Sequence, residues 1–243
     1  MIATSKKLVA TFGMALAALA AATVLAAPAK PGTAKPAGPR NWNLAVTRTP
    51  LDSYILGNPA APVKLVAYIS YTCSHCAHFE TESDAPLRIG LIGPGKGSLE
   101  IRSFLRDPVD LTVALLTHCG PPTKFFGTHS AFLRSQATWF APAMALTEGQ
   151  KKRWAEPDFK KRTQAIASDL KFYDIMARRG FNRGMVDACL ADKGLADRLA
   201  KHTKEAGDKN FVTGTPSFLL DGLPLAGTSS WETLQPQVEA RLR

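Results

Sequence analysis

The sequence VKLVAYISYTCSHC occupies residues 63–76 and joins an apolar run to two closely spaced cysteines. Branched and apolar side chains dominate residues 63–70, which predicts a buried strand. A helical pattern starts at the cysteines and continues to about Ile89. Residues 99–105, LEIRSFL, alternate between apolar and polar side chains, which predicts a second strand. The order strand, helix, strand predicts a βαβ unit with a right-handed crossover.

The remainder of the chain predicts a helical insertion followed by a second strand-containing segment. Residues from about 109 to 207 follow helical spacing, with 159–179 as one long amphipathic stretch. The predicted elements after it are a strand at 216–220, a hairpin turn at Asp221-Gly222, a strand at 223–225 and a last helix to about Leu242. A capping box, S-x-x-E from Ser229 to Glu232, is expected to open that helix. The predicted fold class is therefore α/β, with the order βαβ, helical insertion, ββα.

Cys73 and Cys76 are the predicted reactive centre. Two intervening residues let both sulfur atoms meet in the first helical turn, with Cys73 partly exposed and Cys76 more buried. Free N–H groups and the helix dipole stabilise an anion there, and such sites lower a thiol pKa by about 1–5 units. His75 is expected to donate a hydrogen bond or positive charge to the Cys73 sulfur. Because a stabilised thiolate makes the disulfide a stronger oxidant, Cys73 is the predicted nucleophile and Cys76 resolves the mixed disulfide, without a cofactor.

Other interpretations of this cysteine pair remain open. Cys73 and Cys76 could form a purely structural disulfide. His78 extends the motif to C-x-x-C-x-H, which would suit zinc, but His118-Cys119 is the only candidate for a second ligand pair, so no metal is expected. Covalent haem needs histidine directly after the second cysteine, and residue 77 is alanine.

The segment Gly214-Thr215-Pro216 precedes the C-terminal strand and is expected to lie beside the cysteines. Proline removes a strand donor there, and a cis Thr215–Pro216 bond would make a tight turn. The Thr215 backbone could then pair with an extended peptide, as in strand addition. We therefore expect Thr215, Pro216 and Ser74, which follows the first cysteine, to contact the substrate.

Taken together, these motifs resemble the thioredoxin superfamily, and in particular its DsbA-like branch, in which a helical domain interrupts the thioredoxin fold. The resemblance covers roughly Leu51 to the C-terminus. The residues that carry it are LGNPAAPV at 56–63, the strand to YTCSHC at 71–76, GTPSF at 214–218 and Asp221-Gly222.

The resemblance implies a periplasmic oxidoreductase that acts on newly exported, reduced polypeptides, with a cis-proline loop at its peptide groove. It also implies a membrane quinone-linked reoxidase as partner. Two departures bear on the activity: Ser74-His75 replaces the commoner Pro-His, and Ala67 stands where many relatives carry a buried acid. Threonine before the proline also occurs in isomerases of this fold. An isomerase or reductase, and a non-catalytic peptide-binding or chaperone module, are therefore the alternatives.

Cys119 and Cys189 both fall on apolar patterns within the helical region. A structural disulfide between them is favoured because an exported protein meets an oxidising compartment. Two buried free thiols and a second catalytic pair are the alternatives. Closing this loop of about 70 residues would stabilise the fold by roughly 4 kcal/mol in the chain-entropy description.

The N-terminus predicts export. Residues 1–26 carry Lys6 and Lys7, then an uncharged Ala-rich run with small residues before a cleavage site after Ala26. An uncleaved membrane anchor is the alternative. Residues 27–50 are expected to be a Pro/Ala-rich flexible linker. Residues 51–107 and 208–243 would then form the thioredoxin domain, and 108–207 the inserted helical domain.

The remaining basic residues and histidines are typical of a solvent-exposed surface. The net charge is +10 at pH 7, but short basic runs such as Lys151-Lys152-Arg153 fit solvated helix faces, so no nucleic-acid partner is expected. His78, His129 and His202 are expected to face solvent. A monomer is the default expectation.

Overall fold

A mixed sheet forms the centre of the part of the chain that the computed structural model describes, residues 41–210 and 212–243. Within those residues it has six strands: β1 Val46–Arg48, β2 Tyr54–Gly57, β3 Val63–Ile69, β4 Gly97–Ser103, β5 Ser217–Leu220 and β6 Leu223–Pro224. The strand order is β1-β2-β4-β3-β5-β6. β3 and β4 are parallel, as the predicted βαβ unit requires, and the other neighbours are antiparallel.

The central strand β3 is buried on both faces, which explains its nearly continuous apolar sequence. Val63, Leu65, Ala67 and Ile69 join the main core. Val66 and Tyr68 point to the opposite face, where they pack with Ala206 of the long helix α9, Lys193–Asn210. Both sides of the strand are thus covered by helices.

Two helices lie on the main-core face of the sheet: α1, Ser74–Leu87, and α10, Trp231–Arg241. Phe79 of α1 packs against Phe218 of β5, with ring centroids 4.8 Å apart. α1 begins where predicted, with Cys73 at its N-cap, and a π-helical turn at Arg88–Ile92 follows it. The predicted position of the capping box of α10 is wrong by one residue. Ser230 and Thr233 form the box, rather than Ser229 and Glu232.

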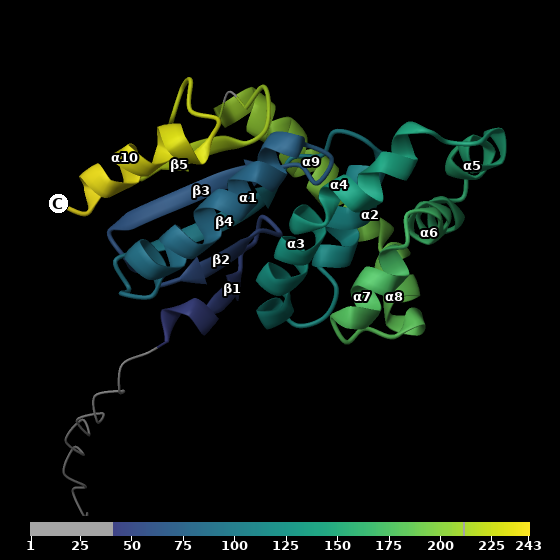
Figure 1. Cartoon of the computed structure of the whole chain (residues 1–243), viewed down its shortest axis with the longest axis horizontal. Coiled ribbons are helices and arrows are strands. Elements are labelled where there is room, and N and C mark those ends of the chain that lie inside the picture. The colour runs from purple at the N-terminus through teal and green to yellow at the C-terminus, as the bar shows by residue number, and fades with distance from the viewer. Residues whose placement is uncertain (1–40, 211) are drawn as a thin grey trace, which may run out of the picture. The chain divides into compact units, whose positions relative to one another are not determined.

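Helices occupy nearly all of the predicted insertion, and Figure 1 shows α2 to α8 gathered at one end of the sheet. Their bounds are α2 Pro108–Thr117, α3 Phe125–Arg134, α4 Gln136–Phe140, α5 Glu148–Trp154, α6 Phe159–Asp169, α7 Phe172–Arg178 and α8 Arg183–Leu190. Residues 159–179 do not form one continuous helix, because Lys171 adopts the left-handed conformation and separates α6 from α7. The last helix of the region, α9, extends to Asn210 rather than ending at 207.

The predicted linker needs a correction at its C-terminal end. Trp42–Leu44 forms a 3₁₀ turn and Val46–Arg48 forms the edge strand β1, whose Val46 lies opposite Leu56 of β2. Backbone pairing and partial burial of Trp42 thus place residues from 41 onward in the folded unit. The predicted signal peptide, 1–26, and residues 27–40 of the linker lie outside the described residues.

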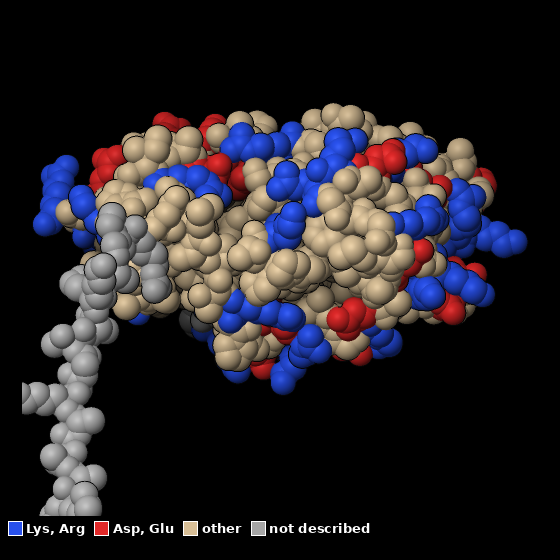
Figure 2. Space-filling model, turned by 90° about the horizontal axis from the view of Figure 1, so that it is seen from below, with Lys and Arg blue, Asp and Glu red and all other residues tan. Residues whose placement is uncertain are grey.

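The predicted disulfide is present: Cys119, just after α2, is bonded to Cys189 of α8. It therefore fastens two helices of the insertion to each other. Figure 2 shows Lys and Arg spread over the face in view, with acidic side chains among them. In the described part of the chain, no helix combines the length and apolar character needed to cross a bilayer.

Candidate active site

Cys73 and Cys76 lie together at the N-terminus of α1, and both are free thiols in this structure. Cys73 is 5% exposed and Cys76 is completely buried, so the predicted order of burial is confirmed, although Cys73 is more enclosed than expected. In its protonated form the Cys73 thiol donates to the carbonyl oxygen of Thr215, 3.1 Å from the sulfur. The Cys73 sulfur is therefore the one that can be approached from solvent, directly beside the Thr-Pro loop.

The surroundings of the two thiols shift their pKa values in opposite directions. A hydrogen bond from the Cys76 thiol lowers the pKa of Cys73 to about 4, against the effect of partial burial. The Thr215 side chain and the backbone N–H groups of Cys76 and His75 act in the same direction as this bond. Burial raises the pKa of Cys76 well above its usual value, and its bond to Cys73 acts in the same direction. At neutral pH, Cys73 is a thiolate and Cys76 a thiol.

The Thr215–Pro216 peptide bond is cis, as the sequence predicts. The Thr215 hydroxyl is buried, has no hydrogen bond of normal geometry in the reduced state, and still lowers the pKa of both cysteines by its proximity. A hollow of about 470 Å³ borders this loop and is lined by residues 212–219 and 224–229. The loop thus presents backbone groups both to the Cys73 sulfur and to an open hollow.

The predicted role of the His75 imidazole stays a prediction. His75 is exposed, and its ring lines a hollow of about 380 Å³ between α1 and α10, together with His78 and Trp231. Among the described contacts, the group of His75 that reaches the Cys73 sulfur is the backbone N–H. Position 75 therefore reaches Cys73 through the helix N-terminus.

Ser74, also expected beside the substrate, is exposed on the other side of α1. It borders a second hollow of about 380 Å³, which is lined in addition by residues of α3, α4 and the turn after α4, including Leu133 and Phe140. The sequence therefore placed Cys73, Cys76, Ser74, Thr215 and Pro216 near one another correctly, with hollows on both flanks of α1.

Three residues of the insertion hold the loop that precedes Cys73, and the sequence analysis missed all three. The buried carboxylate of Asp110 accepts from the Ser70 hydroxyl at 2.6 Å and from the Tyr71 N–H at 2.7 Å. Asp107, the N-cap of α2, accepts from the Thr72 hydroxyl at 2.6 Å. The side-chain amide of Gln136, the first residue of α4, donates to the carbonyl oxygens of Tyr71 at 2.7 Å and Cys73 at 2.9 Å.

Asp110 is the most strongly perturbed carboxyl group near the cysteines. Burial raises its pKa to about 7, although hydrogen bonds from Ser70, Tyr71 and the Arg106 N–H act to lower it. Ala67, by contrast, is fully buried without any polar atom on its side chain. A buried acid is therefore present close to the reactive loop, but on a different element from the one expected by resemblance.

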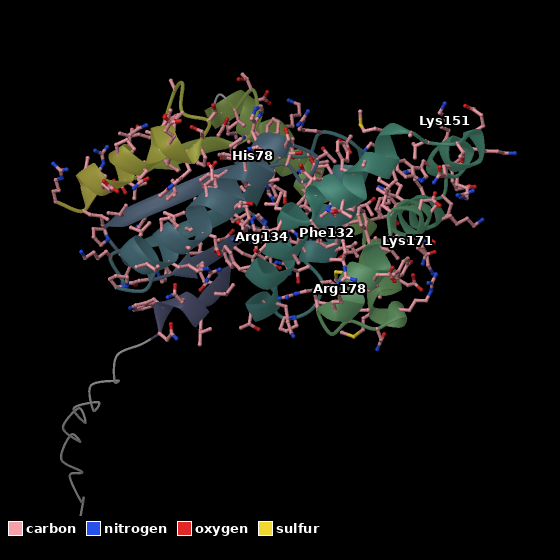
Figure 3. All side chains as sticks on the ribbon, viewed as in Figure 1. His78, Phe132, Arg134, Lys151, Lys171 and Arg178 are labelled. Carbon is pink, nitrogen blue, oxygen red and sulfur yellow. A yellow bond between two sulfur atoms is a disulfide. The ribbon has the colours of Figure 1, made fainter. Side chains whose placement is uncertain are left out.

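A second buried polar network lies below the loop and corrects the prediction for His129. That residue is 2% exposed rather than solvated, because Tyr71 and Glu80 enclose it. The Tyr71 hydroxyl lies 2.9 Å from Nδ1 of His129, and Glu80 lies 3.5 Å from Nε2. Arg134, labelled in Figure 3, extends the network outward from α3 to Glu80 at 3.8 Å and to Asp84. Its hydrogen bonds therefore connect α1, α3 and the reactive loop.

Comparison with known proteins assigns the family. The model of the family described as Thioredoxin matches residues 49–240. The chain therefore belongs to the thioredoxin family. A crystal structure of a protein-disulfide isomerase from Novosphingobium aromaticivorans is 53% identical, with a TM-score of 0.76, and the match covers 79% of this chain and 97% of that one.

The arrangement of the insertion is that of DsbA-like proteins. The crystal structure of Wolbachia pipientis alpha-DsbA1 matches with a TM-score of 0.61 over 76% of this chain and 88% of that one, at 21% identity. A protein of Rickettsia felis, named as a candidate protein-disulfide oxidoreductase, is 24% identical over 77% of this chain. The present chain spans 59% of the length of that relative.

Proposed function

We propose that this protein is a thiol–disulfide oxidoreductase that introduces disulfides into exported polypeptides through Cys73 and Cys76. The observation that carries the proposal is the opposite perturbation of the two thiols, with the pKa of Cys73 lowered to about 4 and that of Cys76 raised. A thiolate that is so strongly stabilised is a good leaving group, and it favours the reduced form of the enzyme. The disulfide form is then an oxidant of substrate dithiols.

The reaction conserves atoms and electrons by two exchanges. A substrate thiolate attacks the Cys73 sulfur of the enzyme disulfide, forming a mixed disulfide and releasing the Cys76 sulfur, which takes up a proton. A second substrate thiolate then attacks the substrate sulfur of the mixed disulfide and releases Cys73 as a thiolate. The substrate loses two electrons and the enzyme gains them, so no cofactor is needed.

The substrate is an extended, reduced polypeptide at the Thr215–Pro216 loop. The Thr215 carbonyl lies 3.1 Å from the Cys73 sulfur, and the hollow of about 470 Å³ continues along the same loop. A peptide that pairs with this backbone would bring its own cysteine to Cys73. Ser74 and the hollow on the α3–α4 side would contact the residues on the other flank.

The proposed site of action is the periplasm, after cleavage near Ala26. The Lys6-Lys7 start and the Ala-rich run support export, and the Cys119–Cys189 disulfide fits an oxidising compartment. After each turnover Cys73 and Cys76 must be reoxidised, and we assign this step to a membrane quinone-linked oxidase. The proposed working form is a monomer that binds no nucleic acid.

Isomerisation of wrong disulfides is the second candidate. The relative from Novosphingobium aromaticivorans, 53% identical, is titled a protein-disulfide isomerase. The same thiolate could attack a substrate disulfide when the enzyme is kept reduced. The low pKa of Cys73 favours oxidation over this activity, since a stable thiolate is a weaker nucleophile.

Two assays with the purified mature chain distinguish these functions. The oxidised protein should form disulfides in a reduced, unfolded substrate protein, and its equilibrium with glutathione should give a potential well above that of thioredoxin. Reactivation of a scrambled substrate by the reduced protein would instead support isomerase activity. Failure of both assays, with Cys73→Ala retaining peptide binding, would favour a non-catalytic binding module.

A further inference from the structure

We propose that Gln136 of the helical insertion is a positioning residue for Cys73, and that its paired hydrogen bonds to the reactive loop hold the nucleophile's sulfur at the N-terminus of α1. The inference rests on the proposed function and assigns to the insertion a direct effect on redox chemistry. Gln136 is buried, at 5% exposure, and one side-chain nitrogen donates to two carbonyl oxygens of the reactive loop, at residues 71 and 73.

The geometry at Cys73 explains why this contact matters. Cys73 is the N-cap of α1, and its carbonyl already accepts from the N–H groups of Cys76 at 3.1 Å and Ala77 at 3.3 Å. Gln136 adds a third donor to that oxygen and also fixes the carbonyl two residues earlier. The 71–72 and 73–74 peptide groups, one before Thr72 and one after Cys73, are therefore held, and with them the direction of the Cys73 side chain.

That direction determines which groups stabilise the thiolate. The Cys73 sulfur depends on the backbone N–H groups of His75 and Cys76 and on the Cys76 thiol, all of which lie in the first turn of α1. A loop without the Gln136 amide can rotate the residue-73 backbone, so the sulfur spends part of its time beyond the reach of these donors. The mean stabilisation of the anion then falls and the Cys73 pKa rises.

Packing in the core alone does not explain a glutamine at position 136. A buried amide is costly to leave unpaired, and an apolar side chain of similar size would pack there without that cost. Both hydrogen bonds go to the loop that carries the nucleophile. The amide therefore links α4 to the cysteine motif.

The test compares Gln136→Met, which keeps the length and removes the donors, with Thr163→Val in the same insertion. Thr163 is also buried, and its hydroxyl donates to the Leu190 carbonyl at 2.8 Å, between α6 and α8. Thr163→Val thus removes a buried hydrogen bond away from the cysteines. The readouts are the Cys73 pKa from thiolate absorbance, the equilibrium constant with glutathione, and thermal stability.

We expect Gln136→Met to raise the Cys73 pKa by about one unit, a tenfold fall in the ionisation constant, and to shift the glutathione equilibrium about tenfold toward the enzyme disulfide. Thr163→Val should lower thermal stability without moving either redox readout. Should Gln136→Met leave the Cys73 pKa at its wild-type value while stability falls as in Thr163→Val, Gln136 is only structural and the proposal is overturned.

A second variant and the wild-type protein complete the design. Gln136→Asn keeps an amide but is one methylene shorter, so it serves if the methionine variant does not fold, and it should shift the pKa in the same direction. An unchanged pKa in that variant contradicts the proposal equally. An ordinary Cys73 pKa in the wild type would instead overturn the proposed oxidase function, whatever the Gln136 variants do.

Discussion

Cys73 and Cys76 are one helical turn apart, yet their environments act on them in opposite directions. Cys73 sits at the N-cap of α1, where backbone N–H groups and the neighbouring thiol stabilise an anion. Cys76 is fully buried, and burial keeps it protonated. The asymmetry defines one attacking or leaving sulfur and one resolving sulfur without any further catalytic group.

The ionisation of Cys73 makes the stability of the reduced protein depend on pH. Its folded-state pKa of about 4 is below the ordinary value of 9.0. The thiolate therefore contributes stability that is fully present above pH 9 and is lost as the pH falls through about 4. At pH 7 we expect up to about 4 kcal/mol more stability in the reduced form than at pH 4 from this group alone.

Denaturant unfolding of the reduced protein and of Cys73→Ala between pH 4 and 8 measures this contribution. The difference between the two curves should shrink as the pH falls. Rate constants for alkylation of Cys73 give an independent value, with half of the maximal rate near pH 4. A pH-independent difference, together with a midpoint near 9, would contradict the assignment of the thiolate.

Cys76→Ser should trap the enzyme in its mixed disulfide. As predicted from the sequence, Cys76 is the sulfur that resolves the mixed disulfide, by attacking the Cys73 sulfur and releasing the substrate as a thiol. With serine there, a substrate whose single cysteine is supplied as its mixed disulfide with glutathione should be attacked by the Cys73 thiolate and release glutathione thiol. The substrate should then remain bonded to Cys73, visible as a reductant-sensitive adduct by mass spectrometry. Cys73→Ser is the matched control and should form no adduct, and equal adduct formation by both variants would exclude Cys73 as the nucleophile.

At the scale of elements, the insertion and the sheet meet at the reactive loop. Asp107 and Asp110 at the start of α2, and Gln136 at the start of α4, contact residues 70–73. Each of these side chains comes from the N-terminal end of a helix. The loop between β3 and α1 is thus held by three side chains from two helices, which keeps the Cys73 sulfur beside Thr215.

Asp110→Asn tests the buried carboxyl at this junction. Because burial raises the pKa of Asp110 to about 7, its protonated form contributes stability that is fully present below its ordinary pKa of 3.8 and is lost as the pH rises through 7. The wild type should therefore lose up to about 4 kcal/mol from this group between pH 4 and well above 7, and the asparagine variant should not.

The measurement is best made on the oxidised protein, in which Cys73 does not titrate and cannot mask the effect. Unfolding free energies from pH 4 to 9 should show a steeper decline in the wild type than in Asp110→Asn. Parallel curves would mean that Asp110 is ionised throughout, held by the hydrogen bonds from Ser70, Tyr71 and Arg106.

At the scale of the whole molecule, one disulfide and one polar network stabilise parts that the sheet does not reach. The Cys119–Cys189 bond joins two helices 70 residues apart in the sequence. The Tyr71–His129–Glu80 network joins the loop before the cysteines to α3 and α1. The disulfide-bonded Cys119 and Cys189 thus lie on different elements from Cys73 and Cys76.

The double variant Cys119→Ala/Cys189→Ala should lose about 4 kcal/mol of stability, the value expected for a closed loop of this length. The Cys73 pKa should stay unchanged, because neither residue contacts the reactive loop in the described contacts. Denaturant unfolding and thiolate titration on the same sample check both statements. A shifted Cys73 pKa would show that the disulfide acts on the active site.

Local sequence determined much of this protein. The apolar run 63–70 predicted β3, the spacing of Cys73 and Cys76 predicted a thiolate at a helix N-terminus, and the helical insertion followed from periodicity. These features depend on neighbours within a few residues, such as strand propensity and helix capping. Local pattern therefore suffices for the order of elements and for placing the two cysteines at the start of a helix.

Only the tertiary structure decided which distant groups act on the cysteines. The burial of His129 and the contacts of Gln136 and Asp110 with the reactive loop depend on how the insertion packs against the sheet. Hydrogen bonds between residues about 40 to 65 positions apart leave no periodic signal in the sequence. Their physical basis is the packing of α2, α3 and α4 around one loop, and that exists only once the chain has folded.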